Sequence, residues 1–100
     1  MERNPDQSPP GGIAPHLTIR GRRAAQAIDF YAAAFGAREL HRVPSEDGRV
    51  MHCHLVINGG SLMLNDDFPD FKGGQEAGPP EGVTLHLQVD DADAAWDRAI

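Results

Sequence analysis

Four of the five histidines stand at polar positions of short segments in which apolar and polar residues alternate: His16, His52, His54 and His86. Neutral imidazole is the commonest protein ligand for zinc, nickel and iron, and imidazoles combined with a carboxylate form such metal sites. These residue types predict a divalent-metal centre or a polar cleft if the fold brings them to one surface. The simpler interpretation is that each histidine faces solvent from an antiparallel sheet.

Other polar residues accompany these histidines. Thr18 and Arg20 follow His16 at a spacing of two, so all three share one face of a strand. The planar guanidinium of Arg20 suits an anionic group of a substrate. Asp66 and Asp67 offer oxygen ligands, although paired aspartates at this point also fit the solvated start of a loop.

The elements that must position these residues follow from periodicity. Alternation predicts strands, helical spacing of alanines and aromatic residues predicts one helix, and Asp47-Gly48 and Asn58-Gly59 are hairpin turn signals. The predicted order is a strand at 13–20, a helix at 22–35 and antiparallel strands at 37–44, 49–58 and 61–65.

The strand at 49–58 shows the clearest alternation. Met51, Cys53, Leu55 and Ile57 share its apolar face, and His52 and His54 lie on the other with Val50 and Val56. This position predicts that Cys53 is an inert thiol of the core.

The chain divides into four segments. Residues 1–12 are rich in proline and polar residues and predict a disordered tail, and residues 13–66 form the first module. Residues 67–82 predict a surface linker, whose flanking Phe68 and Phe71 could close over an apolar ligand.

A second strand and helix are expected at the end of the chain. Residues 83–90 alternate again, Asp90 and Asp91 suit a helix cap, and an apolar stripe begins after them. Residues 86–100 also match residues 16–30 weakly in sequence and in predicted element order, which indicates an internal repeat. The second copy lacks the three strands that follow the helix in the first, so a partner chain or further sequence must supply them.

The chain resembles the vicinal oxygen chelate superfamily of glyoxalases, bleomycin-resistance proteins and dioxygenases, and most of all its PhnB-like branch. The resemblance rests on residues 27–31 (Ala-Ile-Asp-Phe-Tyr), 35–37 (Phe-Gly-Ala), 59–66 (Gly-Gly-Ser-Leu-Met-Leu-Asn-Asp) and 87–94 (Leu-Gln-Val-Asp-Asp-Ala-Asp-Ala). It implies an α+β fold of paired βαβββ modules, with the second module truncated after its first helix. In this superfamily the paired sheets enclose a cleft for a metal ion or a small ligand.

The resemblance also bears on a metal site. It places His16 at the position of the first metal ligand, but Thr84 at the corresponding position of the second module and Met63 at the position of the usual glutamate. His86 lies two residues after Thr84 and could replace it. A cofactor such as Zn, Ni, Mn or Fe is therefore possible, held by His16 and His86, whereas the absence of a bound metal is the favoured expectation.

Composition excludes several other classes of function. Nine lysines and arginines stand against 15 aspartates and glutamates, giving a net charge of −6, which argues against nucleic acid or a membrane as a partner. A single cysteine permits no intramolecular disulfide and fits a cytoplasmic location.

Two functions remain at this stage. The favoured one is a PhnB-like domain that binds a small molecule in a cleft lined by His16, Thr18, Arg20, His52, His54, Met63, Thr84 and His86. The alternative is a divalent-metal-dependent, glyoxalase-type lyase or isomerase that uses His16. A homodimer is expected in either case, because an incomplete second module leaves an open strand edge.

Overall fold

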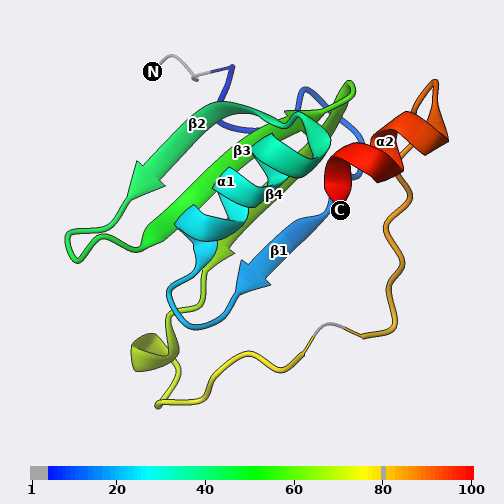
Figure 1. Ribbon diagram of the computed structural model, residues 1–100. Helices are drawn as coiled ribbons and strands as arrows, with labels where there is room; N and C mark the ends of the chain where they lie inside the picture. Colours follow the sequence, from blue (N-terminus) through cyan, green and yellow to red (C-terminus); the bar gives the residue numbers. More distant parts are fainter. Residues whose placement is uncertain (1–4, 80) are drawn as a thin grey trace.

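The computed structural model describes residues 5–79 and 81–100, so residues 1–4 of the expected tail and Pro80 of the expected linker lie outside the described residues. The elements in chain order are β1 (His16–Ile19), α1 (Ala24–Phe35), β2 (Arg38–Pro44), β3 (Val50–Ile57), β4 (Gly60–Asp66), a short 3-10 helix η1 (Pro69–Phe71) and α2 (Ala92–Ala99) (Figure 1).

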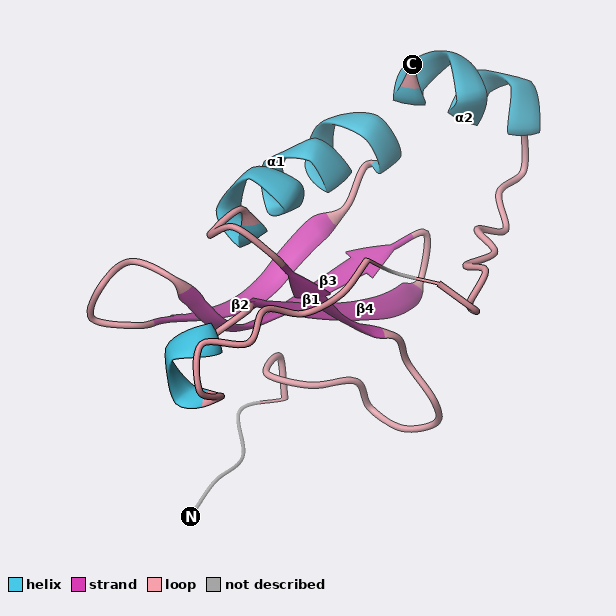
Figure 2. Ribbon diagram, turned by 90° about the horizontal axis from the view of Figure 1, so that it is seen from below, coloured by secondary structure: helices cyan, strands magenta, loops and turns pink. Residues whose placement is uncertain are grey.

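The four strands form one sheet in the order β1-β4-β3-β2. β2, β3 and β4 are antiparallel neighbours, as the turn signals predicted, and β1 pairs with β4 in parallel. Asn58 and Gly59 both have positive φ in the β3–β4 turn, which is the geometry that a tight hairpin requires. Helix α1 lies across one face of the sheet, and neither of the two α-helices in the described part of the chain covers the opposite face (Figure 2). This arrangement is the α+β fold expected of one βαβββ module.

The hydrophobic core lies between α1 and the sheet. It consists of Ala24, Ile28, Val50, Cys53, Leu55, Leu62 and Leu64. Burial raises the pKa of the Cys53 thiol to about 11, and the negative charge of Glu39 adds to this effect. The thiol is therefore protonated at neutral pH, and the prediction that Cys53 belongs to the core is confirmed.

An irregularity in the ladder between β2 and β3 changes which side chains enter this core. Val43 pairs with His52 and Pro44 pairs with Val50, so Met51 has no partner on β2. Such a bulge reverses the alternation of side chains along the strand. Val50 is consequently buried at 2% exposure while Met51 is 56% exposed, so the prediction that Met51 lies on the apolar face and Val50 on the polar face was wrong.

Helix α1 begins two residues later than predicted because Gly21 and Arg22 both have positive φ, which no right-handed helix permits. Its N-terminus is capped by a residue from β4 rather than by its own N-cap residue. The carboxylate of Asp66 accepts a hydrogen bond from the backbone N–H of Ala24 at 3.0 Å and another from that of Val50 at 2.7 Å. Asp66 and Asp67 are 2% and 5% exposed, so the expectation of a solvated loop start was wrong for both.

Replacement of Asp66 tests this capping arrangement. Asp66→Ala leaves two buried N–H groups without an acceptor, and we expect the free energy of unfolding to fall by about 3 kcal/mol. Urea denaturation followed by circular dichroism measures this change. Glu46→Ala, at an exposed turn position, is the control and should change stability by less than about 0.5 kcal/mol. Equal effects of the two substitutions would contradict the capping role.

Arg49 joins the β2–β3 turn to the segment after β4. Its guanidinium contacts Asp47 and forms two hydrogen bonds to the carboxylate of Asp70, at 2.7 and 3.0 Å. It also lies 4.1 Å from the ring centre of Phe68. These hydrogen bonds from Arg49 hold the pKa of both the Asp47 and Asp70 carboxyls below their ordinary range, with Ser45 contributing at Asp47. Phe68 is thereby held against the turn, whereas Phe71 is exposed.

The two lowered carboxyl pKa values predict a dependence of stability on pH. A carboxyl whose pKa is lower in the folded state stabilises it fully above the ordinary pKa of about 4, and this stabilisation is lost as pH falls through the folded pKa. Arg49→Met should therefore make the urea midpoint less sensitive to pH between about 4 and 2. The exposed Arg38 supplies the control, and Arg38→Met should keep the wild-type acid dependence. An unchanged acid dependence in Arg49→Met would contradict the assignment.

The C-terminal part differs most from expectation. Residues 83–89 are extended but pair with no strand in the described part of the chain, so the strand predicted there is not formed. A strand requires a hydrogen-bonding neighbour, and no described strand lies in hydrogen-bonding register with this segment. Among the described residues, the side chains of Asn58 and Arg98 form hydrogen bonds between this part and the first module. Asn58 donates to the carbonyl of Gln88, and Arg98 donates to the carbonyl of Ala33 at 3.0 Å.

Helix α2 begins at Ala92 with Asp91 as its N-cap, as the sequence predicted, and it lies beside the C-terminal end of α1 (Figure 1). No helix among the described residues is long and apolar enough to cross a membrane.

Candidate functional site

The sheet face opposite α1 carries most of the polar residues singled out in the sequence. We call it the histidine face and define it by Thr18, Ser61, Met63 and Asn65 together with His16, His41, His52 and His54. His16 pairs with Met63, Met63 with His54, and His54 with His41, so these four residues form one row across all four strands. Paired residues of neighbouring strands point to the same side of a sheet, which explains why the row is continuous.

Three imidazoles of this face lie close together. The ring centre of His52 is 6.0 Å from that of His16 and 6.5 Å from that of His41. Nε2 of His16 is 2.6 Å from Oδ1 of Asn65. Because an amide oxygen only accepts, this contact requires a proton on Nε2 of His16.

His54 is the most deeply buried residue of the histidine face, at 2% exposure. Its Nδ1 lies 2.8 Å from the backbone carbonyl oxygen of Asp6, and its Nε2 lies 2.9 Å from Oγ of Ser61. The carbonyl can only accept, so Nδ1 carries a proton and neutral His54 accepts from the Ser61 hydroxyl through Nε2. His52 makes a similar contact, with Nε2 2.5 Å from the carbonyl oxygen of Gln7.

The contacts of His54 predict its tautomer. Most neutral histidines carry the proton on Nε2, whereas His54 should carry it on Nδ1 because Asp6 provides a carbonyl acceptor there. Long-range ¹H–¹⁵N correlation spectra recorded at about pH 8, above the ordinary histidine pKa, distinguish the two forms. His86, whose Nε2 contacts the side-chain oxygen of Gln88, is the internal comparison and should show the Nε2 form. An Nε2 proton on His54 would contradict this geometry.

The structure separates seven of the eight predicted site residues into two groups, and Arg20 belongs to neither. His16, Thr18, His52, His54 and Met63 share the histidine face. Arg20 follows the last residue of β1 and is exposed.

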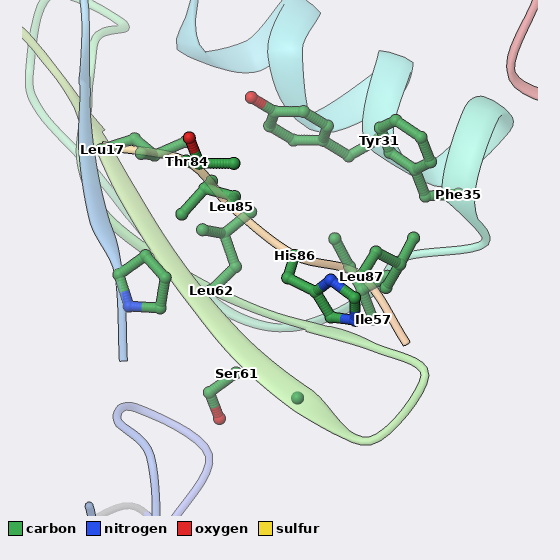
Figure 3. Close-up of a pocket in the computed structure, with 12 residues that line it drawn as sticks. Leu17, Tyr31, Phe35, Ile57, Ser61, Leu62, Thr84, Leu85, His86 and Leu87 are labelled. Carbon is green, nitrogen blue, oxygen red and sulfur yellow. The ribbon is translucent and has the colours of Figure 1, made fainter. Parts of the chain in front are cut away.

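Thr84 and His86 lie with the second group, on the α1 side of the sheet. They line a pocket of about 430 Å³ together with Leu17, Tyr31 and Leu62 (Figure 3). Its size falls in the range of small-molecule pockets, and its walls are mainly apolar. Residues 84–87 form one wall, and they belong to the extended segment that pairs with no strand.

The donor set does not fit a metal ion. The described residues contain no group of three or more histidines, cysteines, aspartates or glutamates that could hold one. His16 lies in a row with the thioether of Met63, which is a poor ligand for hard divalent ions, and His86 lines the pocket on the other side of the sheet. We therefore derive no chemical step through a metal.

Sequence reasoning missed three residues of this face: His41, Ser61 and Asn65. In a strictly alternating strand, His41 would lie on the same face as Glu39. The β2–β3 register shifts between Glu39 and His41, so His41 pairs with His54 and lies on the histidine face instead. Asn65 belonged to the predicted strand at 61–65 and shares the face of Met63, so its position alone could have identified it.

Comparison with known proteins gives a family. The sequence profile of the Glyoxalase/Bleomycin resistance protein/Dioxygenase superfamily matches residues 13–100.

Two relatives from mycobacteria match most of the chain. Uncharacterized proteins of Mycobacterium bovis and Mycobacterium tuberculosis are each 48% identical to it over 92 residues. The matches cover 88% of this chain, but 59% of the M. bovis protein and 53% of the M. tuberculosis protein. The chain thus spans little more than half the length of these relatives.

Solved structures share the fold. A gene product from Arabidopsis thaliana is 27% identical with a TM-score of 0.66, and the match covers 89% of this chain and 70% of that one. The PhnB protein from Bacillus cereus is 16% identical with a TM-score of 0.58, over 89% of this chain and 70% of that one. The fosfomycin resistance protein FosX from Listeria monocytogenes, complexed with Mn(II), is 13% identical with a TM-score of 0.57, over 91% and 68%.

Proposed function

The chain belongs to the Glyoxalase/Bleomycin resistance protein/Dioxygenase superfamily, and from this premise we propose that it is a PhnB-like domain that binds a small molecule against the histidine face. One observation carries this proposal: the row His16–Met63–His54–His41 crosses all four hydrogen-bonded strands on the face opposite α1. Four imidazoles on one surface offer directional hydrogen bonds, and Met63 adds an adaptable apolar contact.

The rigidity of the support favours this face over the apolar pocket. Every strand of the histidine face is fixed by its neighbours, and the reverse side of the same strands is the buried core. The wall formed by residues 84–87 has no such support. Binding groups held on paired strands keep their geometry better than groups on an unpaired segment.

We propose that a second copy of the chain completes the cleft. The extended segment exposes Val83 at 79% and Leu85 at 53%, and Trp96 of α2 is 67% exposed. One edge of β1 pairs with no strand among the described residues. Apolar side chains beside an open strand edge are typical of an interface. A cytoplasmic location remains the expectation from the single cysteine.

Native mass spectrometry tests the assembly. A homodimer at micromolar concentration is the expected result, and it should weaken when Leu85 and Trp96 are both replaced by serine. Glu46→Ala, in the exposed turn remote from this segment, should leave the dimer intact. A monomer for the unaltered chain would overturn the dimer proposal.

Ligand binding is tested by screening small molecules against the ¹⁵N-labelled chain. Bound molecules should shift the backbone signals of Thr18, Met63 and Asn65, which line the face. His16→Ala should weaken binding by about tenfold, since it removes one directional hydrogen bond. His86 lines the apolar pocket, so His86→Ala should leave binding to the histidine face unchanged. Shifts confined to Tyr31, Phe35 and Leu87 would instead place the ligand in the apolar pocket.

The alternative, a metal-dependent lyase or isomerase that uses His16, rests on the position of His16 in the family pattern and on FosX, which was solved with Mn(II). Exposure of the chain to zinc, nickel and manganese before native mass spectrometry tests it. Under this alternative one metal ion binds per cleft, and His16→Ala weakens zinc or nickel binding by about tenfold or more. Unchanged binding in His16→Ala would remove His16 from any metal site.

A further inference from the structure

The N-terminal segment lies across the histidine face. Residues 5–12, expected to be a disordered tail, form turns beneath the sheet on the side opposite α1 (Figure 2). His54 lies on this face of the sheet and is only 2% exposed, and the backbone carbonyl of Asp6 contacts its Nδ1. The segment therefore contributes to the burial of the face that we propose for the ligand.

The contacts of this segment resemble those of a bound molecule. Its backbone carbonyls at Asp6 and Gln7 accept hydrogen bonds from His54 and His52, respectively. Both contacts use oxygen acceptors of the segment and imidazole N–H donors of the face. Two adjacent carbonyls thus satisfy two imidazoles that lie two residues apart on β3.

The segment is held in a way that permits release. It joins no strand of the sheet, since the sheet contains only β1, β4, β3 and β2. Pro5, Pro9 and Pro10 restrict its backbone, which lowers the entropy lost when the segment docks. A segment that docks through hydrogen bonds to side chains and lies outside the β-ladder can leave without breaking that ladder.

We propose that residues 5–8 are an internal stand-in for the ligand, and that the ligand presents oxygen acceptors to His52 and His54 and binds by displacing this segment. The inference rests on the proposed function because it concerns the same face. It specifies the ligand class as molecules that carry carbonyl or carboxylate oxygens, and it makes the N-terminal segment an autoinhibitory element.

A synthetic peptide of residues 1–12, added to a variant that lacks residues 2–12, tests the docking of the segment. We expect binding that shifts the signals of His52 and His54, and at least tenfold weaker binding to the full chain, whose own segment competes. A peptide of the same composition in scrambled order is the control. Equal binding of both peptides, or no binding to the shortened chain, would overturn the proposal.

A matched pair of substitutions tests the role of the imidazole donor. In the shortened chain, His52→Leu removes the N–H donor and should weaken peptide binding by about tenfold, whereas His52→Gln keeps a donor and should retain most of it. His52 is only half-buried, so both variants should fold, and ¹H–¹⁵N spectra verify this. Equal losses in the two variants would contradict recognition through the donor.

Benzoate tests the ligand class, with benzylamine as a probe of similar size that lacks the oxygen acceptors. Benzoate should bind the shortened chain at least tenfold more tightly than the full chain, and benzylamine should bind neither. Equal benzoate affinity for both chains would overturn the competition while leaving the proposed function intact. Absence of benzoate binding to either chain would overturn the ligand class, and the wider small-molecule screen would then decide the proposed function separately.

Discussion

The buried carboxylate of Asp66 is the interaction on which the rest of the structure depends. It lies at the end of β4 and accepts from the first residue of α1 and from the first residue of β3. Three elements far apart in sequence are thereby fixed at one point. Because α1 is held over one face of the sheet, its apolar side chains fill the core there, and the other face remains available to polar side chains.

The two faces of the sheet are therefore not independent. Cys53 and Leu55 pack beneath α1, and His52 and His54 alternate with them along the same strand. A displacement of β3 large enough to separate the imidazoles would also disturb the core, which is densely packed and resists deformation. The polar row gains its precision from the apolar side of the sheet, while the N-terminal segment that lies against it is attached through hydrogen bonds to the His52 and His54 side chains.

Local patterns in the sequence predicted much of this module. The helix, the three antiparallel strands and the hairpin at Asn58-Gly59 follow from periodicity and turn chemistry, which depend only on neighbouring residues. The errors arose where contacts between residues far apart in the sequence determine the local structure. The bulge at Met51 requires knowledge of the pairing with β2, and the burial of Asp66 depends on a helix more than 40 residues away. Residues 83–89 have the alternation of a strand but lack its neighbour. His41 joined the histidine face only through a register shift that the sequence does not display.

The two edges of the sheet differ in a way that limits how copies can polymerise. β2 carries two register shifts and presents Arg38, Glu39 and Pro44, and bulges, charges and proline all discourage the addition of another strand. β1 is short and carries no such irregularity in its pairing with β4. A sheet that can extend at one edge only cannot form an endless ribbon. Two copies joined through β1 would bury their open β1 edges against each other and leave only the two β2 edges exposed. The β2 bulges therefore disfavour fibre growth, in addition to shaping the core.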